Sequence, residues 1–173
     1  DLIGEKYGED AEAEGAAAAG LEAQESILLL PACQVTTVAM RVAQMLHRTL
    51  ALATECGADD AEAALVFYHT GRDLLDLFRA IVPTQHGASV REVPRLAALL
   101  FNDCCFLAHV ALTVGYMYRA RLPPPLSRAA CCVDLAQPLR ALADQTLRDS
   151  WKSQRDQVLS FLERDESAAG TAS

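Results

Sequence analysis

The sequence predicts an all-α protein that folds as an antiparallel helical bundle. The 173 residues are 51% hydrophobic, which is enough to bury the core of one domain. Ala, Leu and Arg dominate the segments in which apolar residues recur at helical spacing. The sequence lacks the pattern of a β-hairpin, in which runs of alternating apolar and polar residues flank a tight Asn-Gly or Asp-Gly turn. Helix is therefore favoured throughout the periodic part of the chain.

The acidic character of the chain is confined to its N-terminal end. The net charge is -8, but residues 1–25 hold eight acidic residues and one Lys, a charge of -7, which leaves -1 for the rest. We expect residues 1–25 to be an acidic flexible tail or linker, because they bury too little apolar surface to offset the entropy of ordering. Without a basic stripe, the sequence predicts no direct binding of nucleic acid.

The bundle segment is expected to span residues 26–166, and residues 167–173 to form a second flexible tail. The first helix is predicted near 31–56, because Pro31 suits a first helical turn and Gly57 suits a helix end. The second is predicted near 60–82. Asp59 and Glu62 are spaced as an N-cap residue and its reciprocal partner are, and Pro83 is expected to end the helix.

A compact turn carrying Pro83, His86 and Gly87 is predicted to lead into a third helix near 94–122. Pro94 would occupy its first turn, and three consecutive prolines from Pro123 forbid its continuation. The fourth helix is predicted near 135–165. Asp134 is its expected N-cap, Gln137 lies three residues on, and Pro138 falls within the first turn, where a missing N–H costs little. Its apolar stripe is expected to include Leu135, Leu139, Leu142, Thr146, Trp151, Val158 and Leu162.

The third predicted helix is apolar, but the sequence does not favour a membrane span. Asp103 interrupts the apolar run, and only 15 uncharged residues follow from Cys104 to Tyr118, which is too few to cross a bilayer unaided. We therefore expect a buried core helix and no transmembrane segment.

The six cysteines predict neither a disulfide framework nor a metal site. No secretory signal opens the chain, so the thiols are interpreted as reduced and intracellular. The adjacent pairs Cys104-Cys105 and Cys131-Cys132 lack the Cys-x-x-Cys spacing by which two thiolates bind one zinc ion. No cofactor and no metal ligand are predicted.

One pair of residues leaves an enzymatic alternative open. Cys105 and His109 lie four residues apart and would share a helical face, as a thiol nucleophile and its base or two metal ligands require. Two such groups on a buried face more often fill a core, and the sequence contains no nucleophile elbow, phosphate loop or His-Glu-x-x-His motif. A scaffold without catalytic residues is preferred to a small thiol- or metal-dependent enzyme.

Several polar side chains fall inside the apolar periodic helices, where burial would force them to pair. We predict an interhelical hydrogen-bond network between the second and third helices, with a solvent-facing or partner-facing row as the alternative. Asp103 is expected to be at least partly buried, with Arg72 and His69 as its first candidate partners. The candidates for the network are His69, Arg72, Asp73, Asn102, Asp103 and His109.

The central part of the chain carries a series of motifs in a fixed order. They are His-Thr-Gly-Arg-Asp-Leu-Leu-Asp-Leu-Phe from His69, Val-Pro-Thr-Gln-His-Gly from Val82, and Pro-Arg-Leu-Ala-Ala-Leu from Pro94. Phe-Asn-Asp-Cys from Phe101 and Tyr-Arg-Ala-Arg-Leu-Pro from Tyr118 follow. In order and spacing these motifs resemble those of the zeste-white-ten (Zw-ten) family of kinetochore and vesicle-tethering proteins. Members of the family are several times longer, so this chain resembles a segment of their C-terminal half.

The resemblance implies a non-enzymatic part of an elongated rod of helical bundles. Members of that family join Rod and Zwilch at kinetochores, where they support dynein recruitment and the spindle checkpoint. In interphase they belong to a tether at the endoplasmic reticulum that captures Golgi-derived vesicles through SNARE proteins. The implied location is cytoplasmic, at the kinetochore in mitosis and peripheral at the endoplasmic reticulum membrane, with protein subunits as partners.

Overall fold

A computed structural model describes residues 34–124, 126–128 and 132–170 of the chain. It contains four long helices, α2 (Thr37–Cys56), α3 (Ala61–Glu92), α4 (Pro94–Tyr118) and α5 (Val133–Gly170), and a short 3₁₀ helix η2 (Leu126–Arg128) before α5. The all-α antiparallel fold class is confirmed. The first predicted tail, residues 1–25, lies outside the described residues, as do residues 171–173 of the second predicted tail, whereas residues 167–170 of that second tail belong to α5.

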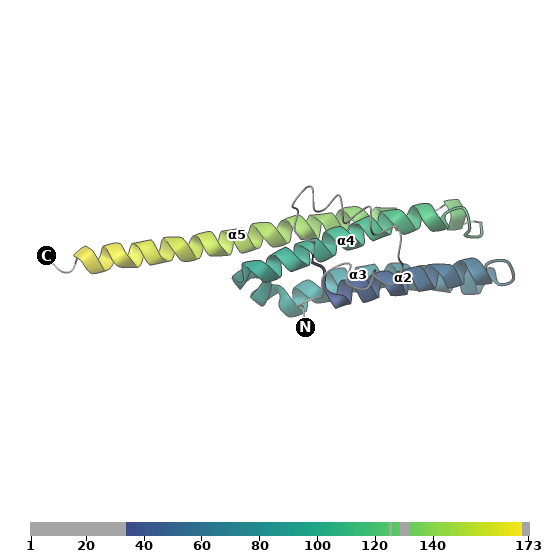
Figure 1. Ribbon diagram of the computed structural model, residues 1–173, viewed down its shortest axis with the longest axis horizontal. Helices are drawn as coiled ribbons and strands as arrows, with labels where there is room; N and C mark the ends of the chain where they lie inside the picture. The colour runs from purple at the N-terminus through teal and green to yellow at the C-terminus, as the bar shows by residue number, and fades with distance from the viewer. Residues whose placement is uncertain (1–33, 125, 129–131, 171–173) are drawn as a thin grey trace, which may run out of the picture.

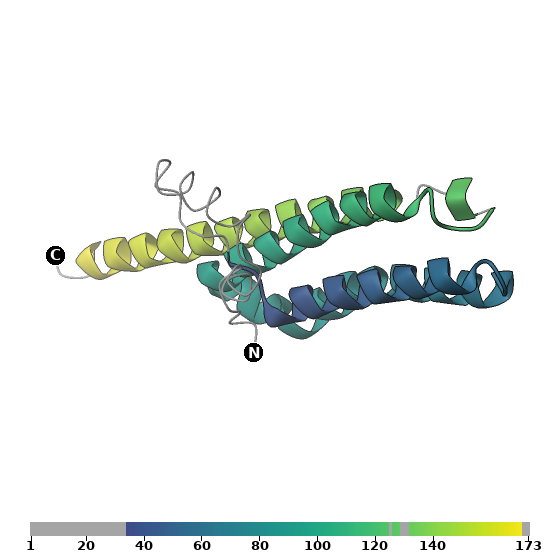
Figure 2. The ribbon, with the colours of Figure 1, turned by 45° about the vertical axis from the view of Figure 1, so that its right-hand side comes forward.

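The bundle is built from two helical hairpins, α2 with α3 and α4 with α5 (Figure 1). Within each hairpin the two helices run in opposite directions and pack extensively along their lengths. The two hairpins join at the corner between α3 and α4 and lie side by side (Figure 2). At their other end, Pro123 of the loop after α4 packs against Gly57, where an added Cβ would lie 2.8 Å from the proline ring.

A repeat of alternating three- and four-residue spacings selects the packed faces. Because this repeat averages 3.5 residues, it keeps one stripe of each helix against its neighbour at a shallow crossing angle. In α2 the buried residues are Ala39, Ala43, Leu46, Leu50 and Ala53, and in α3 they include Ala64, Tyr68, Gly71, Leu75, Phe78 and Val82.

Glycine 71 allows α2 and α3 to approach closely. A Cβ at this position would lie 2.7 Å from the Thr49 hydroxyl and 3.1 Å from a methyl group of Leu46. The hairpin connection is correspondingly short, and the Asp60 carboxylate caps α3 by accepting hydrogen bonds from the N–H groups of Glu62 and Ala63. The N-cap is thus Asp60, one residue after the predicted Asp59.

The predicted turn at Pro83, His86 and Gly87 is wrong, because α3 continues without interruption to Glu92. Proline inside a helix removes one hydrogen bond and costs about 3 kcal/mol. Two buried residues of the same helix, Val82 and Val90, offset this cost by packing into the core on either side. The hydroxyl of Thr84, the residue after Pro83, also donates to the carbonyl of Ala80 at 2.7 Å.

The chain reverses instead at Val93, the one residue between α3 and α4. Its extended backbone (φ -114°, ψ 104°) is the conformation favoured before proline, and Pro94 opens α4 as predicted. The N–H of Val93 donates to Ser89, and its carbonyl accepts from Leu96 and Ala97. The backbone groups of the reversal are therefore largely satisfied.

Helix α4 is central to the core, which confirms the prediction of a core helix. By length and composition it is apolar enough to cross a membrane, but 56% of its apolar window is buried inside the bundle. It ends at Tyr118, four residues before the predicted limit. Its buried residues include Ala97, Leu100, Cys104, Leu107, Ala111 and Val114.

Helix α5 is longer than predicted and behaves differently in its two halves. It starts at Val133, so Asp134 lies in its first turn and is not the N-cap. Leu135, Leu139 and Thr146 are buried as the predicted stripe requires. The same stripe fails beyond Ser150, because Trp151, Val158 and Leu162 are exposed. There α5 extends past the ends of the other helices (Figure 1).

Candidate interaction site

A buried polar clamp fixes the start of α2 to the middle of α4. The backbone N–H of Thr36 donates to Oδ1 of Asp103, and the Thr36 hydroxyl donates to Oδ2, both at 2.7 Å. The same hydroxyl accepts a hydrogen bond from the N–H of Ala39 at 3.2 Å and so caps α2. Both side chains are fully buried. The clamp satisfies a carboxylate and a helix N-terminus together.

Burial controls the titration of the groups around this clamp. It raises the pKa of Asp103, and the two hydrogen bonds from Thr36 partly oppose the rise. The neighbouring Cys104 thiol is also buried, and burial, followed by the negative charges of Asp103 and Cys105, raises its pKa to about 12. A thiol with this pKa stays protonated at neutral pH, so Cys104 behaves as a core side chain and not as a nucleophile.

A third hydrogen bond holds the chain immediately before α2. The side-chain N–H of Asn102 donates to the carbonyl of Gln34 at 3.0 Å. Asn102 and Asp103 thus both bind residues 34–36, from adjacent positions of α4. These contacts explain two of the predicted network residues, but the contacted segment lies before α2 and not on α3.

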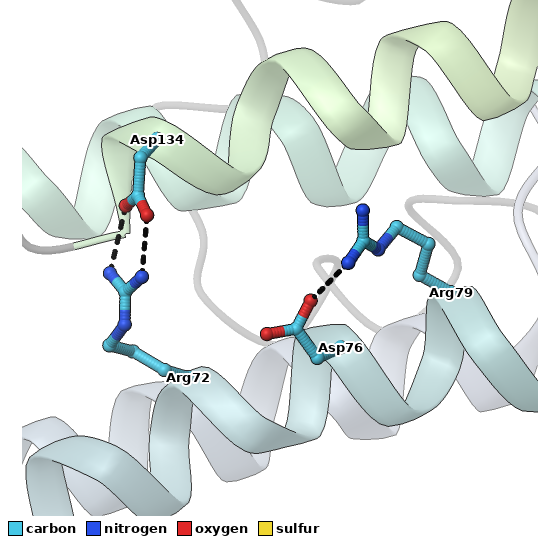
Figure 3. A network of polar contacts seen from close by, with 4 residues as sticks. All are labelled: Arg72, Asp76, Arg79 and Asp134. Carbon is cyan, nitrogen blue, oxygen red and sulfur yellow. Dashed lines mark hydrogen bonds and ion pairs between the residues drawn. The ribbon is translucent and has the colours of Figure 1, made fainter.

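Arg72 binds Asp134 across the bundle, in place of the expected contact with Asp103 (Figure 3). Both terminal nitrogens of the guanidinium donate to the two carboxylate oxygens, which is the bidentate geometry that arginine favours. The contact lowers the pKa of Asp134 and raises that of Arg72, chiefly through hydrogen bonding. It joins α3 to the first turn of α5, beside a local pair between Asp76 and Arg79.

The other predicted network residues lie on the surface. His69 and Asp73 on α3 and His109 on α4 are exposed, and the His69 ring packs edge-on against Tyr68 with 5.4 Å between the ring centroids. The six candidates therefore divide among the clamp at the start of α2, the α3–α5 ion pair and the solvent-facing surface. No such network joins them in the part of the chain that the structure describes.

A groove between α2 and α4 brings the two residues of the enzymatic alternative together. Its volume is about 530 Å³, and Cys105 and His109 both line it, with the partly buried His47 from α2. Burial lowers the pKa of His47. Among the described residues, no group of three His, Cys, Asp or Glu side chains is placed to hold a metal ion. The remaining lining residues are Val35, Asn102, Phe106, Val110 and Thr113.

The end of α5 carries a second surface, which we call the α5 stripe and define as Leu147, Trp151, Val158, Phe161 and Leu162. All five side chains are exposed, Trp151 by 74% and Phe161 by 63%. Positions 147, 151, 158 and 161 follow heptad spacing, with Gln154 at the intervening position. The stripe therefore has the pattern by which one helix packs against another.

The bundle-facing side of α5 becomes polar where the α5 stripe begins. Ser150 is the last buried residue of that side, and Ser153, Gln157 and Ser160 follow it at helical spacing. Packing within the bundle therefore ends near Ser150, and Gln154 makes a contact beyond it by donating to the carbonyl of Glu92 at 3.0 Å. The α5 stripe lies on an adjacent face of α5, whose intervening residue Gln154 contacts the end of α3.

Comparison with known proteins identifies the family. A family described as "Centromere/kinetochore protein zw10, C-terminal" matches residues 28–160, which is more than half of the chain. The chain belongs to the zw10 family. The zw10 homologue of Mus musculus is 30% identical over 134 residues, covering 77% of this chain and 17% of the mouse protein. That of Arabidopsis thaliana is 28% identical over 116 residues, covering 67% of this chain and 15% of the plant protein.

The chain thus spans about one sixth of the length of these zw10 relatives, which confirms the resemblance to a C-terminal part of the family. No solved structure matches it. Sequence reasoning missed Thr36, although a threonine just before an apolar-periodic run is a recognisable N-cap signal. It also missed the heptad spacing of the α5 stripe. The sequence signal for a separate stripe was available, because the bundle-facing side of α5 changes from apolar to polar residues where the stripe begins.

Proposed function

We propose that this chain is a non-enzymatic interaction segment of a zw10-type subunit, acting in assembly and not in a chemical step. At the kinetochore, the segment acts as part of a Rod–Zwilch-type complex, and this complex supports the spindle checkpoint and dynein recruitment. The second role is in a tether at the endoplasmic reticulum that captures Golgi-derived vesicles with SNARE-associated subunits. Family membership and the description of its relatives as centromere/kinetochore proteins support this proposal.

The observation that carries the proposal is the α5 stripe at the projecting end of α5. The side chains of Trp151, Val158 and Phe161 expose apolar surface to water on a helix that leaves its own bundle. This exposure is unfavourable in free energy unless another surface covers them. From Leu147 to Leu162 the stripe extends over about 22 Å at 1.5 Å per residue. Its heptad spacing fits an amphipathic helix, and we assign that helix to a partner subunit of the complex.

Asp103 and Arg72 support the same proposal, because both side chains are engaged in structural contacts. The Asp103 carboxylate is held by Thr36, and Arg72 is held by Asp134. The enzymatic alternative retains Cys105 and His109, which share the groove between α2 and α4. A nucleophile also needs donors that stabilise an oxyanion, and two polar side chains of the groove lining, Asn102 and Thr113, already donate to the carbonyls of Gln34 and His109, which does not favour such a site.

Partner recovery and chemistry separate the two candidates. The full-length protein should recover Rod- and Zwilch-type partners from mitotic cells, and deletion of residues 34–164 should abolish or reduce this recovery. Replacement of Cys105 by Ser should leave recovery unchanged in the full-length protein. Stoichiometric zinc in the purified protein, or a hydrolytic turnover that Cys105→Ser abolishes while the fold persists, would favour the enzyme over the scaffold.

A further inference from the structure

The α2–α3 hairpin turns one side toward the other two long helices and the opposite side away from them. On α2, His47 marks the inward flank, because it lines the groove shared with α4. On α3, Arg72 marks the inward flank, because it binds Asp134 of α5. Helices α4 and α5 lie together beside the hairpin (Figure 2). The outward side is therefore formed by the flanks of α2 and α3 that lie opposite to His47 and Arg72.

This outward side is apolar, and we call it the hairpin face. On helices with 3.6 residues per turn, three side chains of α2 and three of α3 point to it. Met45 and Leu77 are exposed by 51% and 52%, so the face presents large apolar side chains to its surroundings. We define the hairpin face as Val38, Val42, Met45, Leu74, Leu77 and Ile81.

The two rows of the hairpin face lie at matching levels. Gly71 of α3 packs against Leu46 and Thr49 of α2, which sets the register of the hairpin. Because the two helices are antiparallel, each residue forward along α3 corresponds to one residue back along α2. This register sets three pairs level with each other: Met45 with Leu74, Val42 with Leu77, and Val38 with Ile81. The six side chains thus form one continuous surface across two helices.

Charged side chains of opposite sign lie on the two outer edges of the hairpin face. Arg48 on α2 and Asp73 on α3 are both exposed. Neither belongs to an ion pair among the residues that the structure describes. Arg48 lies at the level of Gly71, and Asp73 is two residues, or about 3 Å, further along α3. The α2 edge is therefore basic and the α3 edge acidic at one level of the hairpin.

This pattern is self-complementary about a twofold axis that runs parallel to the helices. Such an axis places α2 of one copy over α3 of a second copy, without a shift along the helices. Arg48 of each copy then faces Asp73 of the other copy, and the apolar rows cover each other. An axis across the helices would instead bring the two α2 edges, with Arg41 and Arg48, together, and like charges disfavour that arrangement.

The size of the hairpin face fits a reversible dimer. Helix α2 has 20 residues and is about 30 Å long. Two packed helices, each about 10 Å wide, offer a face of about 600 Å². Two such faces bury about 1,200 Å² in total, which is the lower end of the range for specific protein interfaces. An interface of this size corresponds to a dissociation constant in the micromolar range.

We propose that the hairpin face is the interface of a twofold-symmetric dimer of this chain, in which Arg48 of each copy pairs with Asp73 of the other. The dimer buries the apolar rows of both copies and uses charges that the fold of the single chain leaves without an ion pair. The hairpin face is separate from the α5 stripe, so this inference does not rest on the proposed partner of α5. A helix of a different protein is the competing occupant.

Charge exchange tests this proposal by sedimentation equilibrium of the full chain. Arg48→Asp sets acid against acid at both contacts of the dimer, and Asp73→Arg sets base against base. Each variant alone should therefore dimerise at least about tenfold more weakly than the parent. An equimolar mixture restores opposite charges at both contacts and should dimerise with the affinity of the parent. The matched control, Arg140→Asp on the exposed side of α5, changes the net charge equally and should leave the affinity unchanged.

The same experiment contains the results that would overturn the proposal. A parent chain that stays monomeric up to about 1 mM would do so, because that concentration exceeds a micromolar dissociation constant about a thousandfold. Single variants that dimerise as the parent does would assign self-association to another surface. Weakened variants whose mixture also fails to dimerise would contradict the twofold pairing. Since both substituted side chains are exposed, the variants should keep the melting temperature of the dilute parent, which shows that they are folded.

A second variant separates the hairpin face from the α5 stripe. Replacing Trp151, Val158 and Phe161 together by Ser should leave the dimer intact, because these side chains lie on α5. Replacing Leu77 and Ile81 by Ser should abolish it, because both side chains belong to the proposed interface. A dimer that is lost with the first replacement and retained with the second would assign self-association to the α5 stripe and contradict the proposal.

Discussion

The clamp between Thr36 and Asp103 makes a quantitative prediction for Thr36→Ala. The substitution removes the acceptor for the N–H of Ala39, and losing an N-cap costs about 0.5 to 2 kcal/mol. It also removes the hydroxyl that donates to a fully buried carboxylate, which costs about 1 to 3 kcal/mol. The remaining hydrogen bond from the backbone N–H of residue 36 is unaffected. We therefore expect the free energy of unfolding to fall by roughly 2 to 4 kcal/mol.

Urea denaturation of single and double variants measures this effect. Thr36→Ala and Asp103→Ala should show a coupling energy above about 0.5 kcal/mol, because the two side chains share a hydrogen bond. Thr70→Ala is the matched control, since its hydroxyl is exposed and bonds only the carbonyl of Val66, and it should change stability by less than about 0.5 kcal/mol. A loss at Thr36 as small as this control, with additive effects at Asp103, would refute the clamp.

The pH dependence of stability provides a second test of the clamp. Because burial raises the pKa of Asp103 in the folded state above the ordinary aspartate value of 3.8, folding favours the protonated form. The contribution of protonated Asp103 to the free energy of unfolding is fully present below pH 3.8 and is lost as pH rises through the folded-state pKa. Asp103→Asn should remove this decline. Thr36→Ala should shift it to higher pH, because the hydroxyl that stabilises the charged form is lost.

Three further substitutions, each followed by thermal or urea denaturation, test the continuity of α3, the close approach of α2 and α3, and the ion pair between Arg72 and Asp134. Gly87→Ala should stabilise the protein by about 0.5 to 1 kcal/mol, because position 87 is helical and an added Cβ meets only Arg91, at 3.8 Å, whereas a turn there would give no gain. Gly71→Ala should destabilise it, since its Cβ would meet Thr49 at 2.7 Å. Asp134→Asn should cost no more than about 1 kcal/mol, because the carboxylate is 59% exposed. Since its pKa is lowered, that cost should be present above pH 3.8 and vanish as pH falls through the folded-state pKa; a pH-independent cost would contradict the ion pair.

The helical pattern of this chain was predictable because apolar spacing reflects burial directly. The α2–α3 connection and the start of α4 at Pro94 followed from local signals of capping and proline geometry. The end of α3 did not. Val82-Pro83 and Val93-Pro94 are the same dipeptide, yet the first lies within a helix and the second separates two helices. The difference comes from tertiary packing around Val82 and Val90, which no local signal encodes.

The partners of the polar residues were less predictable than their burial. The interruption of an apolar run by Asp103 correctly indicated a buried or partly buried, hydrogen-bonded carboxylate. Its partner Thr36 is 67 residues away in sequence, and the choice between Thr36 and Arg72 depends on how the hairpins pack. Arg72 likewise binds Asp134, a residue that the sequence predicted to be a helix N-cap. Pairing across a bundle is fixed by three-dimensional arrangement and not by residue type.

The most direct test of the proposed assembly role replaces Trp151, Val158 and Phe161 of the α5 stripe by Ser in the full-length zw10-type protein. Because these side chains are exposed and lie beyond the buried face of α5, the variant should melt at the same temperature as the parent. The proposal predicts that it recovers markedly less of its Rod- and Zwilch-type partners from mitotic cells, whereas a control with Lys152, Arg155 and Asp156 replaced by Ser recovers them normally. Undiminished partner recovery by the stripe variant would contradict a partner-binding role for the α5 stripe. A melting temperature of the purified variant below that of the parent would also contradict it, because the stripe would then pack within the protein itself.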